Sequence, residues 1–456
     1  MSVCLGAAVR AARRAVLVAL ILLLVLALCP PLEAQQFLNQ RSVGGVIVLD
    51  NGVLTNADVD ARGNLQRMIA EGLDAVPEGL DRSTPMRKVS LRGLDAAIRE
   101  CLAAGKELPD SVLYLGGLQQ IRYVLVYPKQ NDVVLVGPGE GWRVSPRGAV
   151  VGVTTGRPVM LLDDLLVALR SVSGPTRSVI SCSIDPTVEG LQRLQGHVRK
   201  LRTIGNPQQT AMGIEQQLGP QKISVTGVRD TSHFARVMVA ADYRMKRVSM
   251  GLEPSPIREL PSFPSMMKAS GSGMRNMLPR WWLAPDYQPL LRDPEGLAWE
   301  LRGAAVKTMT EVDFLDATGR RHQTGGADAA SQRWADAMTR NYDELALADP
   351  VFGDLKNCMD LAIVAALIVK ENLAAKAGVS LPALMGSEVP ATANLAAPKQ
   401  VDSKASLVHK GRKWMIACGG VEINPWAIVE KTELSATLRA TRSESAATDP
   451  AAWCWD

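Results

Sequence analysis

Nine consecutive apolar residues, Leu361–Val369, constrain the fold of this chain more than any other feature. A helix that spans a bilayer needs roughly 20 apolar residues, so this run is too short to cross a membrane. A helix at a protein surface keeps its apolar residues on one face, which nine in a row do not allow. The run therefore predicts a helix buried on all sides, within a helical segment over residues 331–377.

The first 34 residues have the three parts of a secretory signal. Arg10, Arg13 and Arg14 make a positive start, residues 15–29 are all Ala, Val, Leu, Ile or Cys, and Ala34 follows a Pro pair as a small residue for cleavage. We expect a signal peptide over 1–34, cleaved after Ala34, and a protein of the periplasm or cell envelope with no membrane span after cleavage. The alternative is a retained signal anchor.

Composition indicates a folded chain that does not bind nucleic acid. Hydrophobic residues make up 47% and charged residues 21%, as in globular proteins. The formal charge of +5 falls to +3 once residues 1–34 are removed, and no basic stripe with interleaved aromatic residues is present. About 420 residues then remain, enough for two or three domains.

The apolar patterning predicts an α+β protein made of several modules. Hairpins near 46–54 and 121–136, with helices near 91–105 and 161–170, indicate an α+β domain over 40–172. Alternating Ile180, Cys182 and Ile184, a helix from Asp185, a strand near 223–225, a helix over 231–245 and a strand Lys246–Met250 predict a small βα-βαβ, ferredoxin-like module over 178–252.

The remaining chain is divided by composition. Residues 253–330 are rich in Pro and aromatic residues and predict an irregular arm wrapped over the other modules. The C-terminal helices over 331–377 follow. We then expect a linker over 378–400, a strand pair over 405–430 and a loose tail over 431–456.

Five cysteines follow Ala34, and an odd number in so long a chain is not a disulfide framework. Cys101 and Cys182 fall on apolar faces and are expected to be buried, unbridged thiols. Only Cys418 and Cys454 are considered as a bridged pair.

Several strings in the chain resemble a family of exported proteins with a domain of unknown function that is common in planctomycete bacteria. They are Leu118–Val124, Gly156-Arg157-Pro158, Ile180–Pro186, Ala240–Pro256, Pro279–Trp282 and Asn357–Asp360. The resemblance implies export and an envelope setting, and it implies no activity, cofactor or catalytic residue.

Two sets of residues are candidates for catalysis. Ser265 and Lys268 have the Ser-x-x-Lys spacing that places a lysine one helical turn from a nucleophile, but the partner motifs of such enzymes are missing. His233 is the best acid–base candidate, beside Asp230 and Ser232. We favour a structural role for it, at the edge of a helix capped by Asp230 and Thr231. The four histidines are not paired at metal-ligand spacing, so neither a metal nor a cofactor is predicted.

Aromatic residues of the arm are candidates for binding. Trp281, Trp282 and Tyr287 offer rings that stack on a glycan, although such residues also anchor an arm to a core. The sequence therefore predicts a binding or scaffolding module of the envelope, whose partner is an unknown protein or glycan. Two alternatives remain: a hydrolase of envelope material that uses Ser265 with Lys268, or His233 with a distant carboxylate, and a structural component of a larger assembly.

We expect cleavage between Ala34 and Gln35, because the apolar run ends in a helix-breaking Pro pair followed by a small residue. Sequencing the N-terminus of the protein made by its own cell tests this, and Gln35 should be the first residue. An intact Met1 in the membrane fraction would show a retained anchor instead.

Overall fold

The computed structural model describes residues 42–43, 46–48, 53–56, 67, 70–174, 177–200, 206–270, 278–315, 321–323, 329–386, 390, 397–408, 413–447 and 452–456. All of them belong to one compact unit, Ser42–Asp456. The predicted signal peptide lies outside the described residues.

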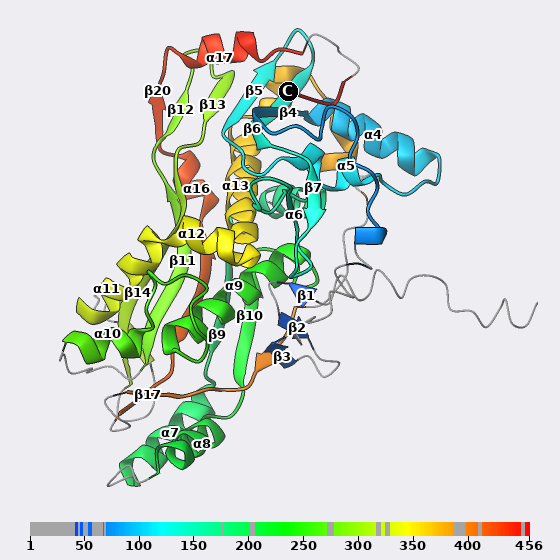
Figure 1. Ribbon diagram of the computed structural model, residues 1–456. Coiled ribbons are helices and arrows are strands. Elements are labelled where there is room, and N and C mark those ends of the chain that lie inside the picture. Colours follow the sequence, from blue (N-terminus) through cyan, green and yellow to red (C-terminus); the bar gives the residue numbers. More distant parts are fainter. Residues whose placement is uncertain are drawn as a thin grey trace, which may run out of the picture. The chain divides into compact units, whose positions relative to one another are not determined.

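A ten-stranded mixed sheet forms one half of this unit (Figure 1). Its strands, in spatial order, are β1 Ser42–Val43, β2 Val46–Val48, β3 Val53–Asn56, β16 Gln400–Val401, β10 Gln221–Thr226, β9 Ile180–Asp185, β19 Cys418–Ile423, β11 Pro279–Tyr287, β14 Gly303–Leu315 and β15 Arg321–Gln323. Two pairs, β3 with β16 and β19 with β11, are parallel, and the others are antiparallel. Neighbouring strands in this sheet therefore come from distant parts of the sequence.

A seven-stranded sheet forms the other half. Its order is β20 Thr432–Leu434, β12 Leu290–Arg292, β13 Ala298–Glu300, β5 Tyr123–Tyr127, β6 Asp132–Gly139, β4 Thr84–Ser90 and β21 Cys454–Trp455. The predicted hairpins are present, because β2 pairs with β3 and β5 pairs with β6. Two small ribbons complete the strands, β7 Trp142–Val144 with β8 Val150–Gly152 and β17 Ser406–Val408 with β18 Lys413–Met415.

Helices α4, α8, α9 and α16 begin at a side-chain cap. Ser90 caps α4 (Leu91–Ala103) by accepting the N–H of Gly93 at 2.8 Å. The other helices are α5 Asp110–Leu113, α6 Leu162–Val172, α7 Val188–Lys200, α8 Pro207–Leu218, α9 His233–Met250, α10 Phe263–Ser270, α11 Ala329–Arg340, α12 Tyr342–Ala348, α13 Pro350–Lys370, α14 Leu373–Ala377, α15 Pro382–Met385, α16 Pro425–Val429 and α17 Leu438–Glu444. A 3-10 turn covers Leu115–Gly117.

The predicted central helix is α13. From Leu361 to Ile368 no residue is more than 1% exposed. The helix packs against α6, α9, α12 and α16 (Figure 1). The α+β class and the buried helix are thus confirmed.

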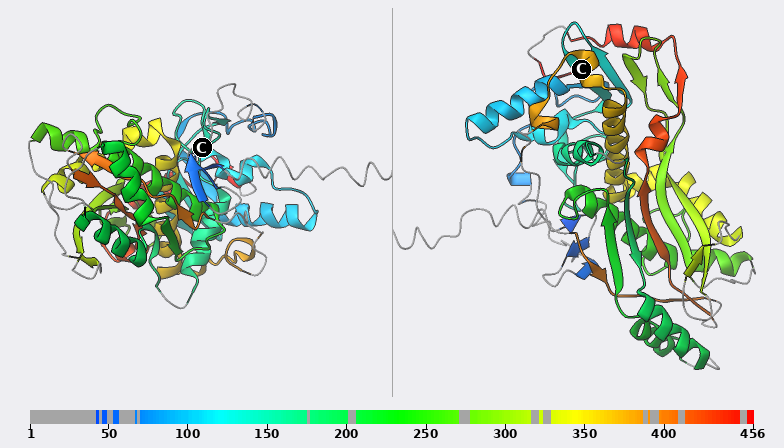
Figure 2. Two further views of the ribbon diagram at one scale, coloured as in Figure 1. Left: turned by 90° about the horizontal axis from the view of Figure 1, so that it is seen from below. Right: turned by 180° about the vertical axis from the view of Figure 1, so that it is seen from behind.

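The ferredoxin-like module is not formed, because its third strand is absent. Lys246–Met250 is the last part of α9, and Gly251 ends this helix in a left-handed conformation, with φ at 69°. Lys246 stays helical because its ammonium reaches Asp242, one turn earlier, at 2.8 Å. Strands β9 and β10 belong to the ten-stranded sheet, and the hairpin of α7 and α8 projects beyond its end in both Figure 1 and Figure 2.

The arm differs from the prediction as well. Residues 279–315 contain two long strands, β11 and β14, which pair antiparallel from Pro279↔Val312 onward. Trp281 and Leu283 are buried while Trp282 between them is half-buried, which is the alternation of a strand. Pro254, Pro256 and Pro261 do lie in an irregular stretch, while Pro264 is the second residue of α10.

The linker and the tail are also more ordered than predicted. Ala383 and Leu384 of α15 are buried, and both of their N–H groups donate to Asp95. In the tail, β21 pairs with β4, and Leu438 of α17 is buried. Of the predicted strand pair over 405–430, β17 and β18 do pair, but β19 joins the ten-stranded sheet. The partners that order these segments lie hundreds of residues away.

Cys182 is buried and unbridged, as predicted, while Cys101 is only half-buried because it lies at the edge of the apolar face of α4. Cys418 and Cys454 are free thiols in different sheets. No helix in the described part of the chain combines the length and apolar composition needed to cross a membrane.

Candidate functional site

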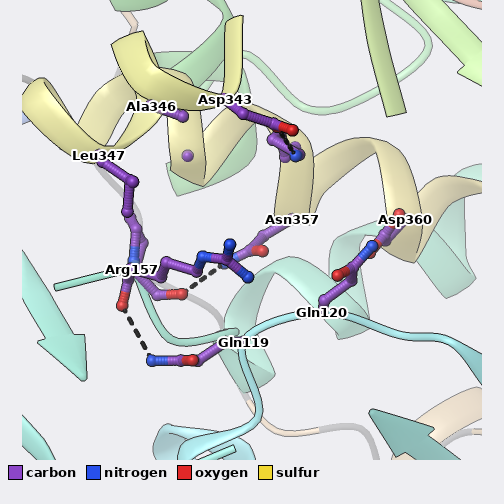
Figure 3. A pocket seen from close by; sticks show the side chains of 11 residues that line it. Gln119, Gln120, Arg157, Asp343, Ala346, Leu347, Asn357 and Asp360 are labelled. Atoms are coloured by element: carbon purple, nitrogen blue, oxygen red, sulfur yellow. Dashed lines mark hydrogen bonds and ion pairs between the residues drawn. The ribbon is translucent and has the colours of Figure 1, made fainter. Parts of the chain in front are cut away.

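A small polar pocket lies over the first half of α13 (Figure 3). Its walls come from four segments: Gln119 and Gln120 before β5, Arg157 and Pro158 after β8, the helix α12, and α13 itself. The lining residues from the helices are Asp343, Ala346, Leu347, Gly353, Lys356, Asn357 and Asp360. The cavity volume is about 40 Å³, which is enough for one small functional group rather than for a whole metabolite.

A buried carboxylate, Glu140, fixes the wall that carries Gln119 and Arg157. Glu140 accepts the backbone N–H groups of Thr154 and Thr155, at 3.0 and 2.8 Å, and the amide of Gln119 at 3.0 Å. Burial alone would raise the pKa of Glu140, but the hydrogen bonds from Thr155 and Thr154 outweigh it and lower the pKa to about 2. Glu140 is therefore charged at neutral pH, and its hydrogen bonds hold the loop before Arg157 in place.

Close packing of the loop on α13 depends on a glycine. A Cβ on Gly353 would lie 2.7 Å from the ring of Pro158, so a larger residue there would push the loop away. One turn later Asn357 donates its side-chain N–H to the carbonyl of Pro158 at 3.1 Å. These contacts set the distance between the loop and the helix, and hence the width of the pocket.

Asp360 forms the deepest part of the floor. Its Oδ2 accepts the N–H of Ile121 at 3.0 Å, and its Oδ1 accepts the hydroxyl of Tyr287 at 2.5 Å. Burial raises the pKa of Asp360 to about 6, although the bonds from Tyr287 and Ile121 and the charge of Lys356 act in the opposite direction. Both oxygens have partners, so Asp360 holds the floor in place and is not free to bind a ligand.

The mouth of the pocket presents groups without partners. Within the described residues the guanidinium of Arg157 makes no hydrogen bond or ion pair, and neither does the amide of Gln120. Lys356, by contrast, is paired with Asp343. The pocket therefore offers one unpaired cation beside an unused amide, above a floor whose polar groups are satisfied (Figure 3).

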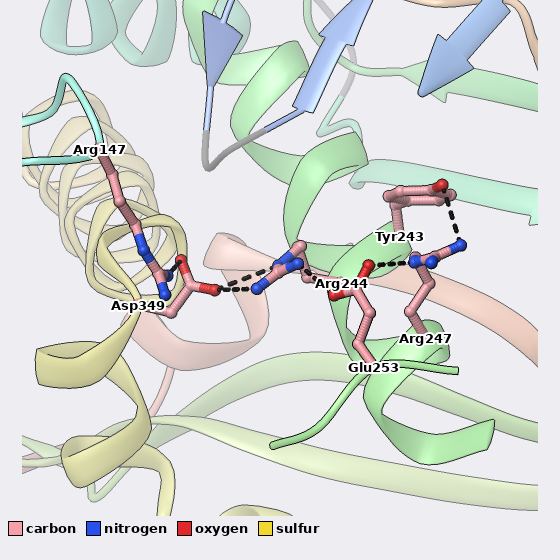
Figure 4. Close-up of polar contacts among 6 residues, drawn as sticks. All are labelled: Arg147, Tyr243, Arg244, Arg247, Glu253 and Asp349. Carbon is pink, nitrogen blue, oxygen red and sulfur yellow. Dashed lines mark hydrogen bonds and ion pairs between the residues drawn. The ribbon is translucent and has the colours of Figure 1, made fainter. Parts of the chain in front are cut away.

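An ion-pair network holds the start of α13 (Figure 4). The buried carboxylate of Asp349 lies 2.8 Å from Nη2 of Arg244 on α9 and 2.9 Å from Nη1 of Arg147, in the turn between β7 and β8. Arg244 and Arg247 both contact Glu253. The network thus joins α9 and the β7–β8 turn to the start of α13, the helix that carries part of the pocket.

His233 contacts a distant carboxylate, Asp164, as only the hydrolase alternative anticipated. The N-cap of α9 is Ser232, not Asp230 or Thr231, and its hydroxyl accepts the N–H of Ala235 at 3.1 Å. His233 is the first residue of the helix, and its Nδ1 lies 2.9 Å from Asp164 of α6. Burial by itself would lower the pKa of His233, but the charge and hydrogen bond of Asp164, with Asp354 and Asp163, raise it to about 9.

This His–Asp contact is the geometry that the hydrolase alternative required. His233 does not line the pocket over α13. The thiol of Cys358 lies near Asp164 and Asp354, and burial together with both carboxylates raises its pKa well above the usual value. A thiol held in the neutral form is a poor nucleophile, so Cys358 is unsuited to attack a substrate.

The other predicted residues lie apart from the pocket. Ser265 is exposed on α10, where its hydroxyl donates to the carbonyl of Ser262; the side chain of Lys268 lies outside the described residues. Trp281 is fully buried against Trp334 and Phe263, with ring centroids at 4.5 and 5.1 Å, and is unavailable to a glycan. Trp282 is half-buried. Only Tyr287 touches the pocket, through its bond to Asp360.

The pocket residues were not predicted from the sequence, because none of them forms a recognisable motif within its own segment. Gln119, Gln120, Arg157, Asn357 and Asp360 come from three strings that carry the family resemblance, yet none was considered as a ligand-binding residue. One signal was present: Asn357 and Asp360 are polar residues three apart, on one face of a largely apolar helix. Buried polar side chains need hydrogen-bond partners, so this pair indicated that other segments contact the helix at this point.

The described residues define a mixed α+β protein with a polar pocket on its central helix. Residues 182–263, from β9 to the start of α10, match a family described as a protein of unknown function, DUF1598. Comparison with curated proteins and with solved structures finds no match. The described part of the chain also holds no group of three or more His, Cys, Asp or Glu side chains placed for a metal ion.

The contact of His233 with Asp164 predicts a pH-dependent contribution to stability. The pKa of His233 is about 9 in the folded protein and about 6.5 when unfolded. The stabilisation is therefore complete below pH 6.5 and is lost as the pH rises through 9. His233→Gln should lower the free energy of unfolding by about 1–3 kcal/mol at pH 6.5 and by clearly less at pH 9.5, as measured by urea denaturation.

His197→Gln on α7 is the matched control, since His197 makes no ion pair within the described residues. Its effect should be small at both pH values. An equal loss of stability at pH 6.5 and 9.5 for His233→Gln would contradict the ionic contact.

Proposed function

We propose that the protein is an exported binding module that holds a carboxylate group in the pocket beside Arg157. The observation that carries the proposal is the unpaired guanidinium of Arg157, next to the free amide of Gln120 and above a floor fixed by Asp360 and Asn357. A guanidinium binds a planar carboxylate through two parallel hydrogen bonds, and a neighbouring amide N–H supports the same charge.

The cavity is large enough for only one functional group, which would anchor a larger molecule. A volume of about 40 Å³ accommodates a carboxylate, while the rest of the ligand would lie over the open mouth. Leu347, which lines this mouth, is 47% exposed and offers an apolar contact. A peptide side chain or a chain terminus that carries a carboxylate fits this description.

Binding is favoured over catalysis by the state of the polar groups. Lys356 is paired with Asp343, and both oxygens of Asp360 are occupied, so neither is placed to exchange a proton with a ligand. A pocket that offers fixed hydrogen-bond donors but no free acid or base is suited to binding a ligand.

The cellular setting rests on the N-terminal sequence. The positive start, the apolar run and Ala34 support export to the periplasm or cell envelope, where the bound partner is a protein or a glycan that carries carboxylates. The matched family region adds no activity to this proposal.

Isothermal titration of the mature protein, starting at Gln35, tests the site with acetate, glutarate and the dipeptide Gly-Ala. We expect binding of at least one carboxylate, weakened about 10- to 100-fold in Arg157→Gln, because a charge-assisted hydrogen bond contributes roughly 1.5–3 kcal/mol. Phosphate should bind more weakly than the carboxylates.

Arg143→Gln is the matched control, because Arg143 is an exposed arginine on the neighbouring strand β7 that does not line the pocket. It should bind as the unaltered protein does. If no carboxylate binds, or if both variants lose affinity equally, the pocket is not the site.

A further inference from the structure

The charged side chains that line the pocket over α13 balance one another. Arg157 and Lys356 are cations, Asp343 and Asp360 are acids, and the other lining residues are uncharged. The buried Glu140 in the wall behind them adds a further negative charge. A carboxylate ligand brings one more negative charge to these surroundings. An ammonium group on the same ligand would offset it.

Of the two acids in the lining, only Asp343 is open to a ligand. Both oxygens of Asp360 accept hydrogen bonds from the protein. The side chain of Asp343, in the first turn of α12, is 71% exposed, and its partner within the described residues is Lys356. The mouth of the pocket therefore presents an accessible carboxylate on α12, on a different wall from the guanidinium of Arg157 (Figure 3).

The ion pair between Asp343 and Lys356 can be exchanged at little cost. Ion pairs in contact with solvent contribute little net stability, because water and salt screen their attraction. A ligand ammonium can take the place of Lys356 at Asp343, and the released lysine can then contact the ligand carboxylate beside Arg157. After this exchange every charge at the mouth has a partner, whereas Arg157 has none before it.

We propose that the pocket recognises an α-amino carboxylate, with its carboxylate between Arg157 and Lys356 and its ammonium on Asp343. The inference rests on the carboxylate site proposed above and names the chemistry next to that carboxylate. The two charged groups of an α-amino carboxylate are attached to the same carbon, which suits partners that line one cavity of about 40 Å³. The rest of the ligand lies over the mouth, against Leu347. Such a group occurs in free amino acids and in amino acids joined to a larger partner through their side chains.

Titration calorimetry of the mature protein at neutral pH tests the inference with propionate, L-alanine and N-acetyl-L-alanine. All three carry the carboxylate, and only L-alanine carries the ammonium. We expect L-alanine to bind about fivefold more tightly than propionate, as one solvent-exposed ion pair allows. N-acetyl-L-alanine should bind no more tightly than propionate. Asp343→Asn should remove the advantage of L-alanine and leave the binding of propionate intact, because Lys356 is then free to contact the carboxylate.

Glu344→Gln is the matched control. Glu344 is the other acid in the first turn of α12; it is exposed and does not line the pocket. Both variants remove one negative charge from the same helix end, so a general effect of charge or of helix stability would change them alike. Glu344→Gln should keep the preference for L-alanine.

The inference is overturned, while the carboxylate site stands, if propionate binds through Arg157 but L-alanine binds no more tightly. It is also overturned if Asp343→Asn keeps the preference. If neither compound binds, the carboxylate site and this inference fail together. A further probe, γ-glutamylglycine, distinguishes the two sources of the group: its binding shows that a linked α-amino carboxylate is accepted, and its exclusion restricts the ligand to free amino acids.

Discussion

The burial of α13 is the constraint on which the rest of the structure depends. A helix that is apolar on all sides has to be surrounded, and α6, α9, α12 and α16 surround it. Its few polar residues connect the helix to neighbouring elements. Asp360 accepts from Ile121, beside β5 of the seven-stranded sheet, and from Tyr287 on β11 of the ten-stranded sheet. Because one carboxylate joins both sheets, the floor of the pocket is part of the most buried region of the chain.

Buried charges fix the helices against the sheets in a similar way. The ammonium of Lys246 donates to Asp242, to the carbonyl of Ile184 at 2.8 Å and to the carbonyl of Gly419 at 3.1 Å. All three of its N–H groups are thus satisfied, and α9 is tied to β9 and β19. Burial raises the pKa of Asp242 to about 6, against the opposing effect of Lys246.

The same contacts show that the matched region, residues 182–263, is not a separate unit. Within it, β9 pairs with β19, and β10 pairs with β16. Both outer partners come from residues 400–423. Removing those strands would leave two edges of the matched region unpaired, and its buried Lys246 would lose the Gly419 carbonyl. The family region is therefore one part of a larger sheet.

Local patterns in the sequence predicted local structure well. The stripe of α4, the hairpin of β5 and β6 and the run Leu361–Val369 each contain their own signal, because cap, turn and periodicity lie within a few residues. The sequence could not show which segments, distant along the chain, contact one another in the fold. The segment of β21 was predicted to be a loose tail, because its partner β4 is distant in the sequence. Lys246–Met250 was predicted to be a strand, but the contact of Lys246 with Asp242 and the helix end at Gly251 show that it is helical. The pocket combines residues from four segments, so no single segment revealed it.

Hydrogen exchange by mass spectrometry tests the role of α13 most directly, because protection reports how far each segment takes part in the stable core. We expect the amides of Leu361–Ile368 to exchange only through global unfolding and to be among the slowest in the protein, whereas the projecting hairpin of α7 and α8 should exchange earlier. If Leu361–Ile368 exchanged as fast as that hairpin, α13 would not be the core around which the sheets and the pocket are built.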